Sequence, residues 1–265
     1  MHSNIHLSPE LQNRRREVLD RLAVFHRPDF RFEEGPHKYY LGETELTSVT
    51  TYLHGFIKPF DAPYWSQQKA KERGVKPTLV LEEWKAIADR ACYLGTEVHK
   101  WIEDFFNGHK GAVEDLDPEV QERIQSFMVL HQSRLHKLIP IAQELRMFNK
   151  KMRLAGTLDA LFMDERGNVY ILDWKTNKKL VTDQDKNYSK MLMEFSGEWD
   201  NNMNHYSIQT SIYRLMLKDE GVDAQGCFIV HVPPTGECRV LPCKDYRPQL
   251  ITHFGLEPAD YGFAI

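Results

Sequence analysis

The chain has 265 residues, of which 42% are hydrophobic and 27% charged, and its formal net charge is −4. This composition indicates a globular protein with a substantial core. The negative charge excludes a uniformly basic protein that coats nucleic acid, although a local basic patch stays open. No apolar run reaches the roughly 18 residues of a membrane helix, and the N-terminus has no apolar signal core. We therefore expect an intracellular protein, cytoplasmic or associated with the nucleoid, that does not bind membranes.

The first half of the chain has the pattern of helices interrupted by one hairpin. Ser8 followed by Pro9 is a helix start signal, and Asp117 followed by Pro118 is another. The predicted helices cover residues 8–25, 64–73, 77–107 and 117–138, with a hairpin over 30–46 and a short helix in "TSVTTYLHGF".

The second half is dominated by strands. "PIAQELRMFN", "MRLAGTLDALFMD" and "NVYILDWKT" are predicted as three consecutive strands. A polar segment over 177–202 is predicted to form a mobile loop above a site. Its aromatic residues Tyr188, Phe195 and Trp199 would either stack on unpaired bases or pin the loop to the body. The helix "MNHYSIQTSIYRLMLKDEG" and the strands "GCFIVHV" and "CRVLP" then complete the fold.

This order of elements predicts an α+β fold, with a central mixed sheet flanked by helices. We expect one compact domain with two parts. Residues 1–87 would form an N-terminal elaboration of helices and a hairpin, and residues 88–265 would form the core.

Two charged residues interrupt "NVYILDWKT", the third of the three consecutive predicted strands. Asp173 and Lys175 are two residues apart, so they project from the same face of the strand. Pairing Asp164 with Asn168 leaves a three-residue loop that ends in glycine, which suits a type I turn with a left-handed last residue. This register places Asp159 directly opposite Asp173.

Two carboxylates that face each other destabilise a hairpin unless something offsets their repulsion. One of them could be protonated, or basic neighbours could neutralise both. A divalent metal such as Mg²⁺ or Mn²⁺ is the other solution. Lys175 favours the metal, because its ammonium group could stabilise negative charge developing beside it. Glu144 on the preceding strand and His99 on a helix are further candidates for the same site.

In this order the residues resemble the RecB-like branch of the PD-(D/E)XK nucleases. Residues 1–87 match no family, apart from a loose likeness to phage-encoded members. The resemblance covers about residues 88–242. It rests on Gly95-x-x-x-His99, Glu144, Gly156-Thr157-Leu158-Asp159, Asp173-Trp174-Lys175-Thr176 and Gln209-x-x-x-Tyr213.

The resemblance implies a restriction-endonuclease-like core and a Mg²⁺- or Mn²⁺-dependent deoxyribonuclease. The leading interpretation is an exonuclease that acts on DNA ends in replication, recombination or repair, in the host cytoplasm if a phage encodes it. A structure-specific or restriction-type endonuclease is one alternative. A non-catalytic DNA-binding or assembly module on a decayed nuclease fold is the other.

The resemblance also implies a role for each site residue. Lys175 would orient or deprotonate the attacking water and stabilise the pentacovalent phosphate. Glu144 would hold a metal-bound water, a second metal or a substrate end. The implied metal ligands are His99, Asp159, Asp173 and the carbonyl of Trp174.

DNA, through single- or double-stranded ends, is the expected partner, together with a recombination or replication protein. Gln209 and Tyr213 share a helix face. The resemblance places them beside the active site, against the nucleic-acid backbone or Lys175, whereas ordinary packing would place them on the sheet. Basic residues at the strand ends would form a rim for phosphates or remain solvated. They are Lys150, Lys151, Arg153, Lys178 and Lys179.

Some RecB-like nucleases carry an iron–sulfur cluster, with one cysteine before the histidine motif and three near the C-terminus. Cys92, Cys227, Cys238 and Cys243 have this distribution, but gaps of 11 and 5 residues separate the last three. The C-terminal cysteines of the family lie closer together. Cys227 also falls in an apolar strand, where a buried free cysteine is ordinary. We therefore expect no cluster.

Overall fold

The computed structural model describes residues 7–109 and 111–263. The first half of the chain contains the predicted helices. The hydroxyl of Ser8 accepts a hydrogen bond from the N–H of Leu11, and the carboxylate of Asp117 caps the later helix in the same way. These helices are α1 (Pro9–Leu22), α2 (Val49–Leu53), α3 (Ala62–Arg73), α4 (Pro77–Phe106) and α5 (Pro118–Ser133).

The predicted N-terminal hairpin is a meander of three strands, β1 (Phe30–Glu33), β2 (Lys38–Leu41) and β3 (Thr44–Ser48). The remaining predicted elements are present as β4 (Ile139–Asn149), β5 (Leu154–Met163), β6 (Val169–Lys175), α6 (Asn202–Asp219), β7 (Ala224–His231) and β8 (Arg239–Pro242). The chain does not end on its last strand as predicted, because α7 (Arg247–Phe254) follows it.

The sheet is mixed, as predicted, and β5 lies at its centre. The strand order is β1-β2-β3-β5-β6-β7-β8, with β4 paired to β5 along its length. The other edge of β5 has two partners. It pairs parallel with β3 at Leu154 and Ala155, and antiparallel with β6 from Ala160 to Met163. Residues 156–159 lie between these two pairings, so this part of β5 faces an opening in the sheet.

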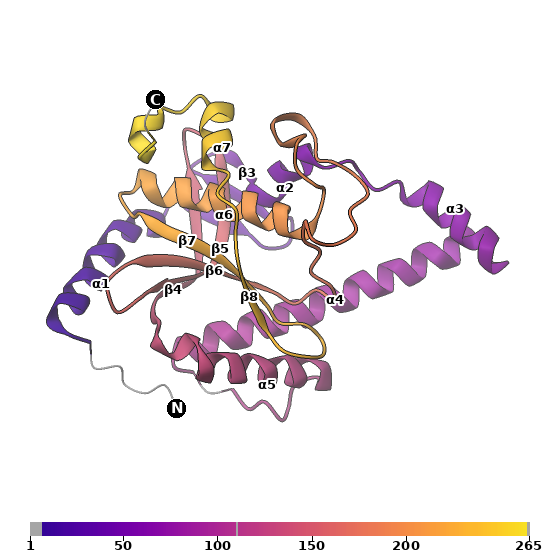
Figure 1. The fold of residues 1–265 in the computed structure, drawn as a ribbon, viewed down its shortest axis with the longest axis horizontal. Helices are drawn as coiled ribbons and strands as arrows, with labels where there is room; N and C mark the ends of the chain where they lie inside the picture. Colours follow the sequence, from indigo (N-terminus) through magenta and orange to yellow (C-terminus); the bar gives the residue numbers. More distant parts are fainter. Residues whose placement is uncertain (1–6, 110, 264–265) are drawn as a thin grey trace.

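Helices cover both faces of the sheet (Figure 1). One face packs against α6 together with α1, α2 and α7, and its core includes Leu161 and Ile171. The other face packs against α4 and α5, and its core includes Phe162 and Trp174. Alternate residues of β5 and β6 therefore belong to different cores, as the period of two in a strand requires.

The β5–β6 hairpin has the predicted register. Ala160 pairs with Leu172 and Met163 with Val169. The Asp164 N–H donates to the carbonyl of Asn168, and Gly167 closes the turn with φ of 82°. Beyond Ala160 the strands separate. There the Trp174 N–H donates to the side chain of Asp159 (2.8 Å) instead of to a backbone carbonyl.

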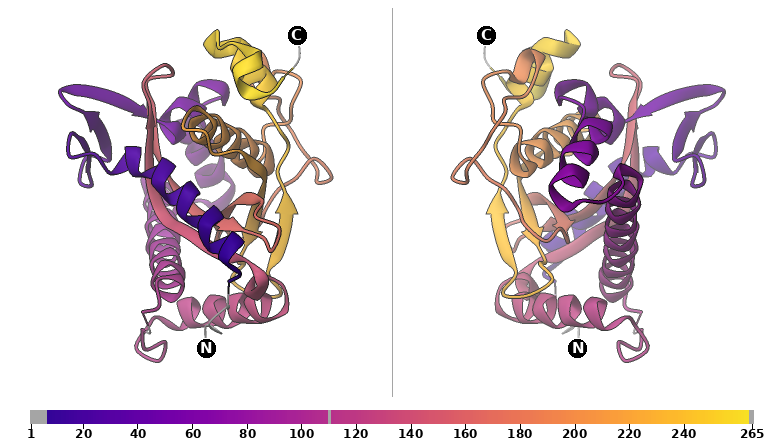
Figure 2. Two further views of the ribbon diagram at one scale, coloured as in Figure 1. Left: turned by 90° about the vertical axis from the view of Figure 1, so that its left-hand side faces the viewer. Right: turned by 90° about the vertical axis from the view of Figure 1, so that its right-hand side faces the viewer.

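Two parts of the N-terminal third extend from the body. Helix α3 and the first half of α4 project to one side (Figure 1), and the β1–β2 hairpin, at one edge of the sheet, also projects from the body (Figure 2). Helix α4 runs without a break past residue 87, where the sequence suggested a division. Among the described residues, no helix has the length and apolar character needed to cross a lipid bilayer.

The polar segment 177–202 is anchored to the body at several points. Phe195 is fully buried, so this residue pins the segment, which is one of the two uses predicted for its aromatic residues. The ammonium of Lys244 lies 2.6 Å from the carboxylate of Asp183 within the segment. Tyr188 is exposed and stays available for contact with a ligand.

Candidate active site

Three ligand-type side chains converge where β5 faces the opening in the sheet. Nδ1 of His99 lies 3.6 Å from Oδ2 of Asp159 and 3.7 Å from Oε1 of Glu144. One donor atom from each residue falls within 4.8 Å of the others. The structure thus brings together His99 from α4, Glu144 from β4 and Asp159 from β5, three elements that the sequence separates widely.

Helix α4 reaches this point because it carries a glycine one turn before the histidine. A Cβ atom on Gly95 would stand 3.1 Å from Oγ1 of Thr176, just beyond the end of β6. Val98 and Ile102 anchor the adjacent face of α4 in the core. The Gly-x-x-x-His spacing therefore has a physical basis, since the glycine permits close approach and the histidine follows on the same side of the helix.

Glu144 is positioned by an unusual backbone conformation. It has φ of 46°, in the left-handed region, which costs a non-glycine residue roughly 1–2 kcal/mol. The flanking pairs Gln143–Ala160 and Leu145–Leu158 place it opposite Asp159. Strain of this kind persists only where the surroundings enforce it, and it is concentrated at functional sites.

Asp173 and Lys175 form an ion pair beside this group, as their two-residue spacing predicts. Nζ of Lys175 lies 2.6 Å from Oδ2 of Asp173, although neither oxygen of this carboxylate has a hydrogen bond of good geometry. Asp173 is only 1% exposed. Burial raises the pKa of Asp173, Lys175 lowers it in part, and Asp159 adds to the rise. Asp173 is not one of the three residues whose donor atoms converge, so its role as a ligand stays a prediction.

The surroundings of Lys175 favour its protonated form. Burial alone would lower its pKa, but the carboxylates of Asp173 and Asp159 outweigh burial and raise the pKa of Lys175. Its ammonium also lies 4.7 Å from the ring centroid of Tyr206 on α6, a cation–π contact. An ammonium held in this way has no free pair with which to take a proton from water. Of the two roles implied for Lys175, the charge-stabilising role fits this geometry better.

The arrangement of Trp174 agrees with its implied role as a carbonyl ligand. Its N–H donates to Asp159, and in an extended strand the N–H and carbonyl of one residue point to the same side. The carbonyl therefore faces β5 as well. The indole ring points to the face of the sheet that packs against α4 and α5, where its centroid lies 5.7 Å from that of Phe127.

Gln209 and Tyr213 share one face of α6, as predicted, and Nε2 of Gln209 donates to the Tyr213 hydroxyl (3.3 Å). Both are buried, with Tyr213 only 2% exposed, and Tyr213 packs on Gly156 of β5. Tyr213 thus contacts the active-site strand directly, and Gln209 is linked to it through Tyr213. Their predicted contact with DNA remains a prediction, and for Tyr213 this burial favours a positioning role.

Two of the basic residues predicted to bind DNA are engaged within the chain. Lys151 is paired with Asp219 at the end of α6 (3.3 Å), and Lys179 is paired with Asp185 (3.4 Å). Arg153 and Lys178 are exposed. Exposed ion pairs contribute little to stability, so these lysines could exchange their partners for phosphates.

The convergent residues suit a hard divalent cation. The two carboxylates supply the oxygen donors that Mg²⁺ and Mn²⁺ prefer, while the imidazole is a donor more typical of transition metals. Burial lowers the pKa of His99, but Asp159 and Glu144 outweigh it and raise the pKa overall. The carboxylates thus create a strong preference for positive charge at this point, which a bound cation would satisfy.

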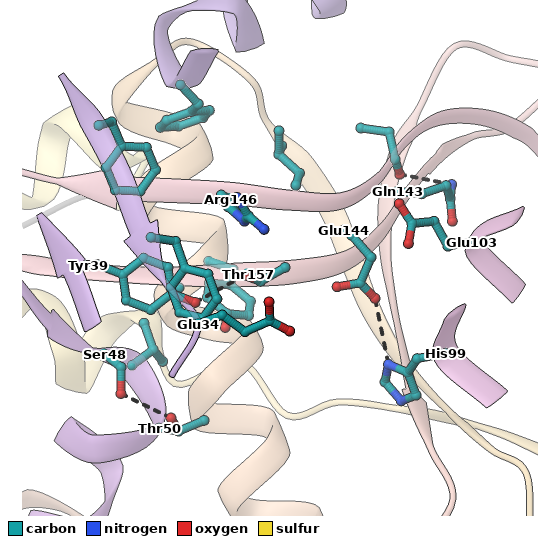
Figure 3. Close-up of a pocket in the computed structure, with 18 of the residues that line it drawn as sticks. Glu34, Tyr39, Ser48, Thr50, His99, Glu103, Gln143, Glu144, Arg146 and Thr157 are labelled. Atoms are coloured by element: carbon teal, nitrogen blue, oxygen red, sulfur yellow. Dashed lines mark hydrogen bonds and ion pairs between the residues drawn. The ribbon is translucent and has the colours of Figure 1, made fainter. Parts of the chain in front are cut away.

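A cavity of about 1220 Å³ leads from His99 and Glu144 toward the β1–β2 hairpin. Figure 3 shows the side chains that face it. Five charged residues of its lining play no part in the predicted site, namely Arg27, Glu34, Lys100, Glu103 and Arg146. Arg146 stands two positions after Glu144 on the same strand, and this spacing is the sequence signal that could have identified it.

Residues 74–254, well over half of the chain, match the PD-(D/E)XK nuclease superfamily. The chain therefore belongs to this superfamily. Its members are nucleases that use divalent metals, with DNA as the substrate, and the mixed sheet with helices on both faces is consistent with their fold. No curated protein matches the chain.

Proposed function

We propose that the protein is a Mg²⁺- or Mn²⁺-dependent deoxyribonuclease of the RecB-like branch, and that it acts as an exonuclease on DNA ends in replication, recombination or repair. One observation carries the proposal. His99, Glu144 and Asp159 converge from three elements beside the Asp173–Lys175 pair. The RecB-like assignment is supported by His99, which lies within 4 Å of Asp159, and by the contact of Tyr213 with β5.

In this proposal His99, Glu144 and Asp159 hold the metal, with Asp173 and the carbonyl of Trp174 completing the protein ligands. The metal, when bound, supplies a water of lowered pKa and neutralises phosphate oxygens. Lys175 places its ammonium where negative charge builds on the phosphate, and it needs no reorganisation to do so. Asp173 orients Lys175 through their ion pair.

The substrate range can be tested with linear and covalently closed circular DNA in Mg²⁺. The proposal predicts that the linear DNA is degraded from its ends and that the closed circle survives. Cleavage of both forms would instead indicate an endonuclease. If both survive in Mg²⁺ and in Mn²⁺, the protein is a non-catalytic module and the proposal fails.

A further inference from the structure

The cavity continues past the candidate metal site to the β1–β2 hairpin, which lies outside the residues that match the superfamily. We propose that this part of the cavity binds an unpaired DNA strand, with a phosphate on Arg146 and a base against the rings of Phe32 and His37. The inference rests on the proposed nuclease function and specifies the substrate that the site accepts.

Arg146 is placed to bind a phosphate next to the candidate metal site. Two residues of an extended strand span roughly 7 Å, so its backbone lies about that far from Glu144. Arg146 is exposed and lines the cavity, and its guanidinium lies 5.0 Å from the ring centroid of Phe32. This contact holds the guanidinium plane while its N–H groups remain available, which suits recognition of a phosphate.

Three rings form an aromatic cluster beside Arg146. The centroid of Phe32 lies 4.6 Å from that of Tyr39 and 5.0 Å from that of His37. Tyr39 is buried, and its hydroxyl lies 3.0 Å from Oγ1 of Thr157, two residues before Asp159. Phe32 is partly exposed and His37 is exposed. The cluster is thus tied to the strand that carries the site, while two of its rings can meet a ligand.

The charges that line the cavity favour an unpaired strand over a duplex. Arg27 is held by Asp29 through two hydrogen bonds (2.6 and 2.7 Å). Among the described residues that line the cavity, Lys100 and Arg146 are the remaining lysine and arginine, and neither forms an ion pair. Duplex binding depends on several phosphate contacts, whereas single-strand binding also gains affinity from bases that stack on aromatic rings. A lining with few unpaired cations and several rings therefore suits the single strand better.

The carboxylates of the lining support the same inference. Besides the candidate metal ligand Glu144, Glu34 and Glu103 face the cavity (Figure 3), and their carboxylates disfavour phosphates close to them. A duplex presents phosphates along both of its edges, and its bases are stacked away from any side-chain ring. An unpaired strand can turn a phosphate toward Arg146 and present its bases to the rest of the wall.

The test compares DNA affinities in Ca²⁺ for a single-stranded oligonucleotide and a blunt duplex of the same length. The wild type should bind the single strand more tightly. Phe32→Leu should weaken this binding at least fivefold, since an apolar side chain without a π face loses the stacking. Arg146→Gln should also weaken it, and should reduce the slope of log affinity against log salt by about 0.7, the value for one phosphate of a single strand.

The other face of the same hairpin provides matched controls. The guanidinium of Arg31 lies 4.8 Å from the ring centroid of Tyr40, a similar pair that does not line the cavity. Arg31→Gln and Tyr40→Leu should leave the affinity for the single strand unchanged. Melting temperatures of all variants separate lost binding from lost folding. If Phe32→Leu does not fold, His37→Ala, which changes an exposed ring, takes its place with the same expected direction.

Three outcomes would overturn the inference while the nuclease function stands. The first is a wild type that cuts DNA but binds duplex more tightly than single strand, and the second is normal single-strand affinity in Phe32→Leu and Arg146→Gln. The third is an equal loss of single-strand affinity in the two control variants, Arg31→Gln and Tyr40→Leu. A different result refutes the nuclease function itself, namely a wild type that neither binds DNA in Ca²⁺ nor cuts it in Mg²⁺ or Mn²⁺.

Discussion

Tyr213 packs so closely on Gly156 that a Cβ atom at position 156 would lie 2.8 Å from its hydroxyl and 2.9 Å from its ring. Gly156 begins the Gly-Thr-Leu-Asp segment that ends at Asp159, and Tyr213 comes from the helix on the opposing layer. The Gly156-Thr157-Leu158-Asp159 motif and the Gln209-x-x-x-Tyr213 motif therefore meet in a single packing contact. This contact sets the distance between α6 and the strand that carries Asp159.

Gly156→Ala should consequently destabilise the protein by about 1–3 kcal/mol, the usual range for an overpacked core, and should lower cleavage activity by displacing Asp159. Thermal unfolding measures the first effect. Gly197→Ala is the control, because no atom lies within 4 Å of a Cβ at that position. Adding Tyr213→Leu to Gly156→Ala should recover part of the lost melting temperature. No recovery would mean that the clash lies elsewhere.

Lys175→Gln should slow DNA cleavage by about 100- to 1000-fold, the effect of removing one group that stabilises charge in a transition state. DNA binding in Ca²⁺ should change little, because Lys175 matters most as charge develops on the phosphate. Single-turnover cleavage and binding, measured on one preparation, separate the two effects.

Lys175→Gln also leaves the buried carboxylate of Asp173 without its ion-pair partner, so the melting temperature of this variant should fall as well. The double variant Lys175→Gln/Asp173→Asn removes that buried charge and should recover stability but not activity. If activity returned together with stability, Lys175 would be a structural residue only.

Glu144→Gly should separate stability from function. Glycine adopts φ of 46° without strain, and relief of that strain offsets the entropy that glycine loses on folding. The variant should be as stable as the wild type, or more stable by up to about 1 kcal/mol, yet at least tenfold less active. Glu144→Gln keeps the strained backbone, so it should lose activity without gaining stability. Full activity in either variant would show that Glu144 is not part of the active site.

The turn that joins the strands of Asp159 and Asp173 should depend on pH through Asp164. The carboxylate of Asp164 accepts hydrogen bonds from the backbone N–H groups of Arg166 (2.8 Å) and Asn168 (2.9 Å). Burial raises its pKa, but hydrogen bonds from the turn outweigh burial and lower the pKa below the unfolded value. Its contribution to stability is thus present above about pH 4, the unfolded pKa of an aspartate, and is lost as pH falls through the folded pKa.

Asp164→Ala should therefore lower the melting temperature more at neutral pH than at about pH 3. Unfolding of the variant and the wild type at both values measures the difference. An equal loss at the two pH values would show that the carboxylate charge does not support the turn.

The sequence predicts the β5–β6 hairpin well because its determinants are local. A strand has a period of two, and Gly167 supplies the left-handed turn residue, so the register follows from residues fewer than twenty positions apart. The convergence of His99 with Asp159 could be predicted only through the resemblance to a family. No periodicity connects a helix to a strand sixty residues later.

Other features depend on contacts that local patterns do not encode. The parallel pairing of Thr47 with Leu154 joins segments more than a hundred residues apart, so the N-terminal strands were not expected in the central sheet. The left-handed conformation of Glu144 is enforced by its neighbours and contradicts its own preference. Arg146 contacts Phe32 in the cavity only when the β1–β2 hairpin has packed beside β4.

The central claim is that Asp159 binds the metal through which DNA is cut. Titration of Mn²⁺, followed by electron paramagnetic resonance, tests it most directly when combined with single-turnover cleavage of linear DNA. Asp159→Asn is the informative variant, since its amide oxygen can still accept the hydrogen bond from Trp174. Glu165→Gln, an exposed change in the nearby turn, is the control. We expect Asp159→Asn to lose both Mn²⁺ binding and cleavage while its melting temperature stays close to that of the wild type. Cleavage by this variant within tenfold of the wild type, about 1.4 kcal/mol, would contradict the assignment.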